Sequence, residues 1–426
     1  MKDQLNIQFK KYFGTEEGGV DLLSSIERLP QNSLESLSGK ISNCQGRIFF
    51  MGNGGSYDNA RWMAQVCREN NIPAKVPGME EDYIITLNRK GYENIFAEGL
   101  KADGLNAADL VIGLSGSGNS QNILMGFESA RSLGAEVFAL GGRDGGKMLK
   151  LIGAENCLVA QNSCMEAIED LHNFAFQAAL TSALKKISTA ELRDQFFDAV
   201  KSFCSEENIQ SMSVMAEGMI KTALEGGRTF ILGTGIGANH FRADMGRGAT
   251  NALPIRGVSA PEVFTMNSLQ ATANDDGTDF ILADGLVKYM PSEKDFAVLC
   301  PMPGQERCFE ICEDILTERG ADYIYIGEKD ICSESFDNNR DLLIAMTGHA
   351  CGKVINEYLN TLFVVRSLNC SVTFKEGQKK LSSKETLELE NKLKNDKVIK
   401  EKEMITFCYG NVFAVSSEAE FVREYY

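Results

Sequence analysis

The sequence has few of the residue types that common metal and nucleic-acid sites require. It contains only three histidines, His172, His240 and His349, in 426 residues, so we expect no histidine-rich metal site within one domain. Lysine and arginine number 43 against 59 aspartates and glutamates, and this net charge of -16 argues against a nucleic-acid partner. Small phosphorylated ligands are not excluded, because local backbone amides can bind an anion within an acidic protein. We expect no metal and no other cofactor.

Long apolar runs are also missing. No stretch approaches the ~20 residues of a membrane span, and Met1–Phe13 lacks the apolar core of a signal peptide. We therefore expect a cytoplasmic protein without a membrane partner. The twelve cysteines form no CxxC pair, which favours small buried apolar residues over a zinc or disulfide framework.

Two segments of the chain echo each other. Residues 47–56 read as an apolar strand that enters a Gly-rich loop, and residues 228–237 repeat that pattern. In each half an arginine lies nine residues after the first glycine of the loop, at Arg61 and Arg242. The repeat indicates an internal duplication.

Paired apolar runs predict the same strand arrangement in both halves. Leu110–Leu114 and Glu136–Leu140 begin 26 residues apart, and Phe296–Cys300 and Asp322–Ile326 repeat that interval. A strand, a helix and a strand at this spacing form a βαβ unit with parallel strands. We therefore expect an α/β protein with two doubly wound parallel sheets, each a flavodoxin-like three-layer αβα domain.

The duplication divides the chain into three predicted regions. The first domain, with a helical lead-in, covers residues 1–188, and the second covers residues 189–368. A C-terminal extension covers residues 369–426, with a charged helix over Lys375–Glu403 and a strand or hairpin over Met404–Val415. This extension either packs on the body or forms a dimerisation arm.

A Ser/Gly loop at residues 115–120 is the strongest local signal. It follows an apolar strand and precedes a predicted helix over Gln121–Gly134. The first amides of a helix are unpaired donors, and the helix dipole favours an anion there. We expect four residues of this loop to bind phosphate, namely Ser115, Ser117, Asn119 and Ser120. The alternative is an ordinary loop that caps a helix. In the first Gly-rich loop, Asn53 and Ser56 are further candidates, although Ser56 could instead be an N-cap.

Four segments of the first half, in this order, resemble the sugar isomerase (SIS) superfamily and its phosphoheptose isomerase branch. They are Gly52–Ser56, Ser115–Ser120, Gly142–Lys147 and Ala167–His172. The second half is less similar, because Pro301–Glu306 replaces the phosphate-loop serines, and we expect no phosphate there. The resemblance implies two SIS domains packed as an internal pair. Since single-domain relatives are oligomers, it also implies a homodimer, a pseudo-tetramer of SIS domains.

The resemblance implies interconversion of aldose and ketose phosphates by a carboxylate base, with a zinc ion in the heptose branch. The family places a His and a Glu four apart on the helix after the first loop. It places a Gln and a His eight apart on a late helix. In this chain Arg61, Gln65, Glu169 and Gln177 occupy these positions, and all four differ from the family pattern.

Replacement catalytic groups are available in both halves. Glu169 and His172 could act together from one helix, or they could be a surface carboxylate and a packing histidine. His349 and Glu357, eight residues apart, could complete a site shared between the halves, or their spacing could be chance. Arg61 could bind a substrate anion or form an inter-domain salt bridge.

Two functions remain open at this point. The first is a phosphoheptose isomerase-like enzyme that acts on a sugar phosphate with a rearranged acid/base set. The second is a non-catalytic sugar-phosphate sensor or regulatory protein.

Overall fold

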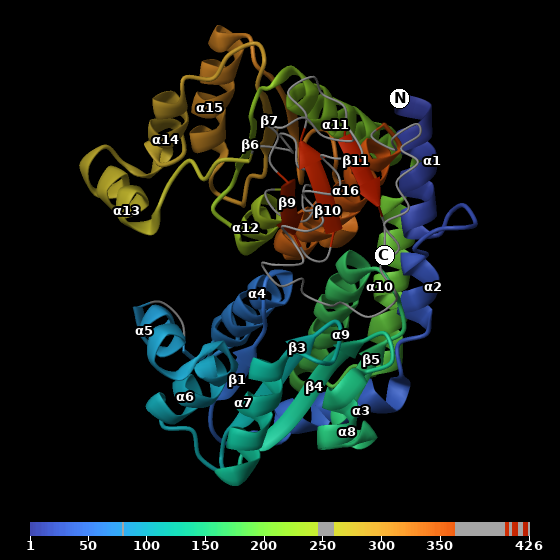
Figure 1. Cartoon of the computed structure of the whole chain (residues 1–426), viewed down its shortest axis with the longest axis vertical. Helices are drawn as coiled ribbons and strands as arrows, with labels where there is room; N and C mark the ends of the chain where they lie inside the picture. The colour runs from blue at the N-terminus through green and yellow to red at the C-terminus, as the bar shows by residue number, and fades with distance from the viewer. Residues whose placement is uncertain (79–80, 246–259, 363–404, 409–410, 416–420, 425–426) are drawn as a thin grey trace.

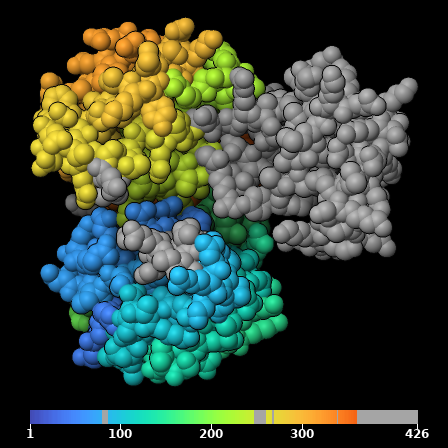
Figure 2. Space-filling view, turned by 60° about the vertical axis from the view of Figure 1, so that its left-hand side comes forward, coloured from blue at the N-terminus to red at the C-terminus, as the bar shows by residue number. Residues whose placement is uncertain are grey.

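The computed structural model describes residues 1–78, 81–245, 260–362, 405–408, 411–415 and 421–424 (Figure 1). Within these residues no helix has the length and apolar character needed to cross a membrane. Figure 2 shows the first half, in blue to green, and the second half, in yellow to orange, as two lobes.

The first half is built on a five-stranded parallel sheet. Its strands are β1 (Ile48–Met51), β2 (Ala74–Lys75), β3 (Leu110–Ser115), β4 (Glu136–Gly142) and β5 (Cys157–Ala160), in the order β2-β1-β3-β4-β5. Strands β1 and β3 are buried at every residue, as expected for strands covered on both faces. This strand order is that of a flavodoxin-like doubly wound sheet, which confirms the predicted fold class.

Helices cover both faces of this sheet because successive strand residues point to opposite sides. Ile48 and Phe50 pack with α3 (Gln31–Asn43), α4 (Gly55–Glu69) and α9 (Met165–Lys185). Phe49 and Met51 pack on the other side with α6 (Ile95–Ala102), α7 (Gln121–Ser132) and α8 (Gly146–Ile152). Alternate residues of Ile48–Met51 thus belong to the hydrophobic cores on the two faces of the sheet.

The second half contains a three-stranded parallel sheet of β6 (Thr229–Leu232), β7 (Phe296–Leu299) and β8 (Asp322–Tyr325). The 26-residue interval is reproduced in the register, because Leu110 pairs with Glu136 and Phe296 pairs with Asp322. Helices α14 (Ala283–Tyr289) and α15 (Glu306–Arg319) cover one face. Helices α11 (Glu206–Glu225), α12 (Ile236–Ala243) and α16 (Arg340–Leu362) pack on the other.

A pair of a buried aspartate and a part-exposed arginine recurs at the same place in each sheet. The backbone N–H of Arg47 donates to Asp109 Oδ1 over 2.7 Å, and its guanidinium lies 3.1 Å from Asp109 Oδ2. In the second half Arg228 makes the same two contacts with Asp295, at 2.7 and 2.8 Å. In each half the arginine directly precedes the first strand of the pair, β1 or β6, and the aspartate directly precedes the adjacent strand, β3 or β7. This shared detail supports the duplication.

The two halves share one apolar cluster. The lead-in helix α1 (Lys2–Phe13) packs on α11 and α16 of the second half, while α9 also contacts α16. Residues from both sheets belong to this cluster, including Phe50 and Val298. The remaining helices are α2 (Leu22–Glu27), α5 (Glu81–Lys90), α10 (Thr189–Phe203) and α13 (Met266–Asp275).

The C-terminal segment contributes a small antiparallel sheet. Its strands are β9 (Ile405–Cys408), β10 (Asn411–Val415) and β11 (Phe421–Glu424), in the order β11-β10-β9. The predicted helix over Lys375–Glu403 lies outside the described residues.

Candidate functional site

The strand order of the first sheet places the topological switch point between β1 and β3, where doubly wound sheets form their ligand crevice. Helical connections leave these neighbouring strands toward opposite faces, and ligands of open α/β sheets bind at such a switch point beyond the carboxyl ends of the strands. The loop after β1 is Gly52–Ser56, and the loop after β3 contains Ser115–Ser120. Both predicted phosphate-binding segments therefore border the same crevice.

The Ser115–Ser120 loop is held by contacts within itself and with the next turn. The hydroxyls of Ser115 and Ser120 lie 3.0 Å apart, and the side-chain amide of Asn119 donates to Ser117 O over 2.7 Å. Gly118 has φ +63°, and a Cβ there would lie 2.1 Å from the carbonyl oxygen of Gly145. The loop shape thus requires a glycine at this position.

Ser120 precedes α7 as its N-cap residue, but its hydroxyl does not cap the helix. It faces Ser115 instead, while the backbone carbonyl of Ser120 accepts from the Leu124 N–H over 3.1 Å. The Ile123 N–H is bonded to Asn122 Oδ1 over 3.0 Å, which leaves the amides of Gln121 and Asn122 in the first turn of α7 for an anion.

The two residues predicted in the first Gly-rich loop have different environments. Asn53 exchanges hydrogen bonds with Asn122 at 2.9 and 2.8 Å and accepts one from Tyr92, so it ties the loop to α7. Ser56 is buried within α4, whose N-cap is Gly54, and this rules out the N-cap alternative for Ser56. Its hydroxyl donates to Glu169 Oε1 over 3.4 Å.

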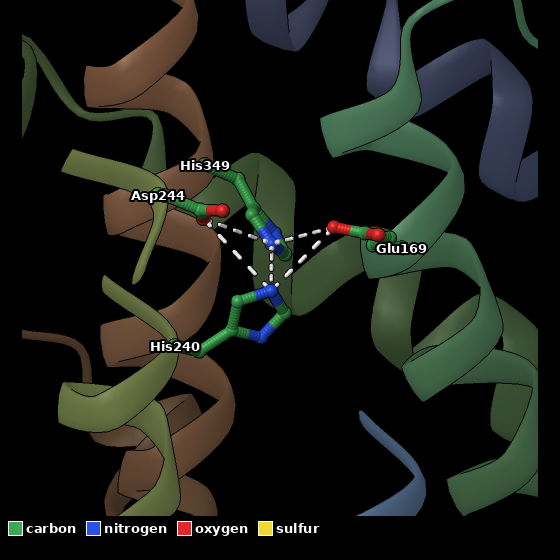
Figure 3. Close-up of side chains that lie close together, drawn as sticks. All are labelled: Glu169, His240, Asp244 and His349. Carbon is green, nitrogen blue, oxygen red and sulfur yellow. Dashed lines mark hydrogen bonds and ion pairs between the residues drawn. The ribbon is translucent and has the colours of Figure 1, made fainter. Parts of the chain in front are cut away.

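Glu169 belongs to a cluster that joins the two halves (Figure 3). Glu169 projects from α9, His240 from α12 and His349 from α16. Asp244 is the residue directly after α12. Glu169 Oε2 lies 3.5 Å from Nε2 of each histidine, and the two Nε2 atoms are 2.9 Å apart. Asp244 Oδ2 lies 3.3 Å from His349 Nε2 and 3.9 Å from His240 Nε2.

A second layer of residues holds this cluster. His349 Nδ1 lies 2.6 Å from Asp170 Oδ1, and the Tyr12 hydroxyl donates to Asp170 Oδ2 over 3.1 Å. Asn59 in α4 donates to the backbone carbonyl of Glu169 over 2.9 Å. The lead-in helix, the first domain and the second domain therefore all contribute to the position of these side chains.

Burial and mutual charge shift the cluster's ionisation. Burial raises the pKa of Glu169, but hydrogen bonds and charge from the two histidines outweigh it and lower that pKa to about 2. Burial raises the pKa of Asp244 to about 6, against the opposing charge of His240 and His349. Burial lowers the pKa of His349, yet the charges of Asp170 and Asp244 outweigh burial and leave it well above its usual range.

The structure unites only part of the predicted catalytic set. Glu169 and His349 meet, and the surface alternative for Glu169 is wrong because its side chain is 8% exposed. His172 is buried and lies outside the cluster, with Nε2 3.0 Å from the Gly141 carbonyl of β4. Glu357 lies about two turns beyond His349 and pairs with Lys353 at 3.2 Å. Both it and Lys353 line a separate cavity of about 270 Å³.

Arg61 and Arg242, the arginines at equivalent positions in the two halves, have different environments. Arg61 is 41% exposed, contacts Asp58 in its own helix at 3.5 Å and lies over the Tyr57 ring. The predicted inter-domain salt bridge is therefore not the contact that Arg61 makes here. Arg242 is buried and donates to the carbonyl oxygens of Ile231 and Gly233, supporting the loop after β6.

His240 and Asp244 were missed from the sequence. They lie four residues apart on and just beyond the helix after the second Gly-rich loop, the spacing that the resemblance assigns to a metal pair. An arginine lies nine residues after the first glycine of each Gly-rich loop, and this shared position selected Arg242 and did not select His240. Asp170 and Tyr12 were also missed, because only the folded chain brings them to His349.

The second half fills its own anion position. The backbone N–H of Gly237 at the start of α12 donates to Asp341 Oδ1 over 2.8 Å. A Cβ at Gly235 would lie 2.4 Å from the same oxygen. This helix start is the counterpart of the start of α4. In Pro301–Glu306, the counterpart of the Ser115–Ser120 loop, the Gly304 N–H likewise donates to a carboxylate, Glu306 Oε1, over 3.0 Å.

No protein-family model matches the chain. Among curated proteins it is similar to phosphoheptose isomerase from Helicobacter pylori strain P12, with 32% identity over 172 residues, 38% of this chain and 86% of the relative. The corresponding enzyme from Cytophaga hutchinsonii is 34% identical over 168 residues, 37% of this chain and 86% of the relative.

A solved structure matches a larger part of the chain. Glucosamine-6-phosphate deaminase from Thermotoga maritima aligns with a TM-score of 0.52 and 12% identity, over 79% of this chain and 94% of that one. At this identity the likeness concerns the fold alone. It extends the fold assignment over both halves, whereas each sequence match covers less than half of the chain.

Proposed function

Because the chain belongs to the SIS-domain phosphosugar isomerase superfamily, with phosphoheptose isomerase homology over 38% of its residues, we propose that it binds a sugar phosphate in the β1/β3 crevice and interconverts the aldose and ketose forms. The single observation that carries this proposal is that Ser56, just after the first Gly-rich loop, donates to Glu169, while Asn53 of that loop bonds to Asn122 at the start of α7, the helix after the Ser115–Ser120 loop. One crevice then holds both an anion cradle and a buried carboxylate.

The phosphate is assigned to the loop and to the first amides of α7. Ser115 and Ser120 supply neutral hydroxyl donors beside those amides, and neutral donors can bind the phosphate without an opposing lysine. The sugar then extends from the loop toward Ser56 and Glu169. The number of carbons in the sugar decides which of its carbons lies beside the Glu169 carboxylate.

Glu169 is assigned as the proton-transferring group, through Oε1. An aldose becomes a ketose when a base removes the proton from C2 and returns it to C1. The hydroxyl proton on O2 leaves as the one on O1 is gained, so the net composition is unchanged. Oε1 is the oxygen on the Ser56 side, whereas Oε2 faces the histidines. His172 and Glu357 stay predictions without a position in this cluster.

A second function, binding without turnover, is favoured by one specific observation. Both oxygens of the Glu169 carboxylate already have partners, Ser56 on Oε1 and the histidines on Oε2. A base needs a free lone pair directed at the substrate carbon. If these partners stay in place when the ligand binds, the protein is a sugar-phosphate sensor or regulatory protein.

One experiment separates the two functions. The full chain is titrated calorimetrically with a panel of aldose and ketose phosphates, including sedoheptulose 7-phosphate, and each ligand that binds is then followed by NMR in D₂O. An isomerase incorporates deuterium at the carbon beside the carbonyl and forms the partner sugar. Saturable binding with no exchange identifies the non-catalytic protein. If no member of the panel binds, both functions are rejected.

The variant Glu169→Gln sharpens the assignment of the base. It should retain ligand binding at the Ser115–Ser120 loop and lose deuterium exchange. Exchange at the wild-type rate in this variant would remove Glu169 from the reaction. A matched control is Glu166→Gln on the first turn of the same helix, which should leave exchange intact.

A further inference from the structure

Four side-chain atoms from three elements converge on one point between the two halves. They are Glu169 Oε2, His240 Nε2, Asp244 Oδ2 and His349 Nε2, and all lie within 4.8 Å of one another (Figure 3). We propose that these residues bind one divalent transition-metal ion of the zinc type, and that the ion joins the first domain to the second.

The separations suit a four-coordinate ion. Zinc bonds to imidazole nitrogen and carboxylate oxygen are about 2.0–2.2 Å long, so neighbouring ligand atoms of a tetrahedron lie about 3.3–3.6 Å apart. Three of the measured separations are 3.3, 3.5 and 3.5 Å. Two more are 2.9 and 3.9 Å. The sixth, between Glu169 Oε2 and Asp244 Oδ2, is within 4.8 Å.

The second layer gives His349 the tautomer that a metal ligand needs. Its Nδ1 lies 2.6 Å from Asp170 Oδ1, so the ring donates its proton there and leaves a lone pair on Nε2. Tyr12 donates to the other oxygen of Asp170 and fixes its orientation. A carboxylate behind a coordinating imidazole is the usual support of a zinc-bound histidine.

The two histidine Nε2 atoms face each other across 2.9 Å, close enough for the Nε2–H of His240 to donate to the lone pair on His349 Nε2. A divalent ion would take the place of that shared proton. With both rings neutral, the carboxylates of Glu169 and Asp244 would leave two buried negative charges. Asp244 Oδ2 is buried and has no hydrogen-bond partner among the described residues. A divalent ion bound to all four atoms satisfies the lone pairs and balances the two charges.

This ligand set differs from the one that the family resemblance implies. Arg61 has no lone pair with which to bind a metal, and Gln65 donates its amide to Glu69 on the same helix. The family's positions in the first domain therefore do not fit a zinc ion. Glu169 is the one member of that set that also belongs to the cluster.

Four protein ligands give a closed site, which is typical of structural zinc. Three of them come from the second half and Glu169 comes from the first. The bond to Glu169 Oε2 would hold α9 against α12 and α16 and leave Oε1 directed at Ser56. This inference stands on the geometry of the four atoms and does not depend on the proposed function.

The test is direct metal binding by the tag-free full chain after treatment with a chelator. Zn²⁺ uptake is measured by mass spectrometry of the metal, and Co²⁺ is titrated for its visible absorption, which reports four-coordination. We expect one equivalent per chain and intense visible bands. His240→Ala and Asp244→Asn should each weaken binding about 100-fold or more, while the far-UV circular dichroism stays that of the wild type.

His172→Asn is the matched control, because it removes a buried histidine outside the cluster and should leave the stoichiometry at one. A folded wild type without saturable uptake would overturn the proposal, as would undiminished binding by both cluster variants. The metal titration is carried out without sugar phosphate, so its result is independent of the proposed function. Metal binding without sugar binding therefore contradicts only the proposed function. Sugar binding without metal uptake contradicts only the metal site.

Discussion

His349 Nδ1 and Asp170 Oδ1 lie 2.6 Å apart although 179 residues separate them in the sequence. His349 belongs to α16 of the second half, and Asp170 belongs to α9 of the first. Their contact joins the two halves directly behind the candidate metal cluster. It also fixes which nitrogen of His349 faces that cluster.

Asp170→Asn should therefore lower metal affinity without removing a ligand. An amide holds the imidazole proton less firmly than a carboxylate does, and loss of such a partner typically costs 10–100-fold in affinity. Competition with a chromophoric chelator measures the change. Tyr12→Phe removes only the hydrogen bond to Asp170 and should have a smaller effect. A Tyr12→Phe effect equal to that of Asp170→Asn would contradict this order.

Gly55→Ala should displace Glu169. A Cβ at Gly55 would lie 2.2 Å from Glu169 Oε2, so the carboxylate must shift from the position in which it contacts the two histidines. We expect weakened metal binding and a loss of about 1–3 kcal/mol in the free energy of unfolding. Urea denaturation and a Co²⁺ titration measure the two effects.

Gly39→Ala is the matched control for that substitution. Gly39 lies inside α3, and a Cβ there meets nothing within 4 Å. Alanine should stabilise this helix by up to about 1 kcal/mol and leave Co²⁺ binding unchanged. If both variants bind Co²⁺ like the wild type, the close approach of Gly55 to Glu169 has no functional consequence.

The fold could be predicted because its signals are local. Strands β1, β3, β4, β6 and β7 are short, largely apolar runs, and the 26-residue interval follows from the length of one helix and two turns. Strands β2 and β5 were not predicted. The Ser115–Ser120 loop is equally local, since a strand, a glycine-containing turn and a helix start are consecutive in the chain. Such features need no knowledge of how distant segments pack.

The candidate cluster could not be predicted in the same way. Glu169 and His349 were selected singly, but their meeting depends on how α9 packs against α16. His172 and Glu357 were selected by helical spacing, yet His172 Nε2 donates to the Gly141 carbonyl and Glu357 pairs with Lys353. Spacing places residues on a face of a helix, and only packing decides what that face meets.

Ser115→Ala should weaken sugar-phosphate binding. The Ser115 hydroxyl is buried against Ser120, and hydrogen bonds to a charged group contribute about 1.5–3 kcal/mol each, equivalent to about 10–150-fold in affinity. Calorimetric titration with a ligand from the panel measures the loss. Ser132→Ala at the opposite end of α7, where the hydroxyl bonds only to Ser129 O, should bind normally. Equal binding by both variants would remove Ser115 from the phosphate site.

The duplicated arginine–aspartate pairs predict a shared pH dependence of stability. Burial raises the pKa of Asp109 and of Asp295, but hydrogen bonds from Arg47 and Arg228 outweigh it, so both carboxyl groups have a pKa below the usual value. A lowered folded-state pKa adds stability above the unfolded pKa of about 3.9, and this stability is lost as the pH falls through the folded value. Below about pH 4 the wild type should therefore lose stability.

Asp109→Asn and Asp295→Asn should each remove part of that acid-dependent loss. At neutral pH each variant should be destabilised by about 1–3 kcal/mol, because the arginine loses its charged partner while remaining about one third exposed. Urea denaturation between pH 3 and 7 follows both effects. Since the contacts are nearly the same in the two halves, the two variants should behave alike. A steep pH dependence that persists in the double variant would assign acid sensitivity to other carboxylates with a lowered pKa, with Glu169 between the domains as the next to substitute.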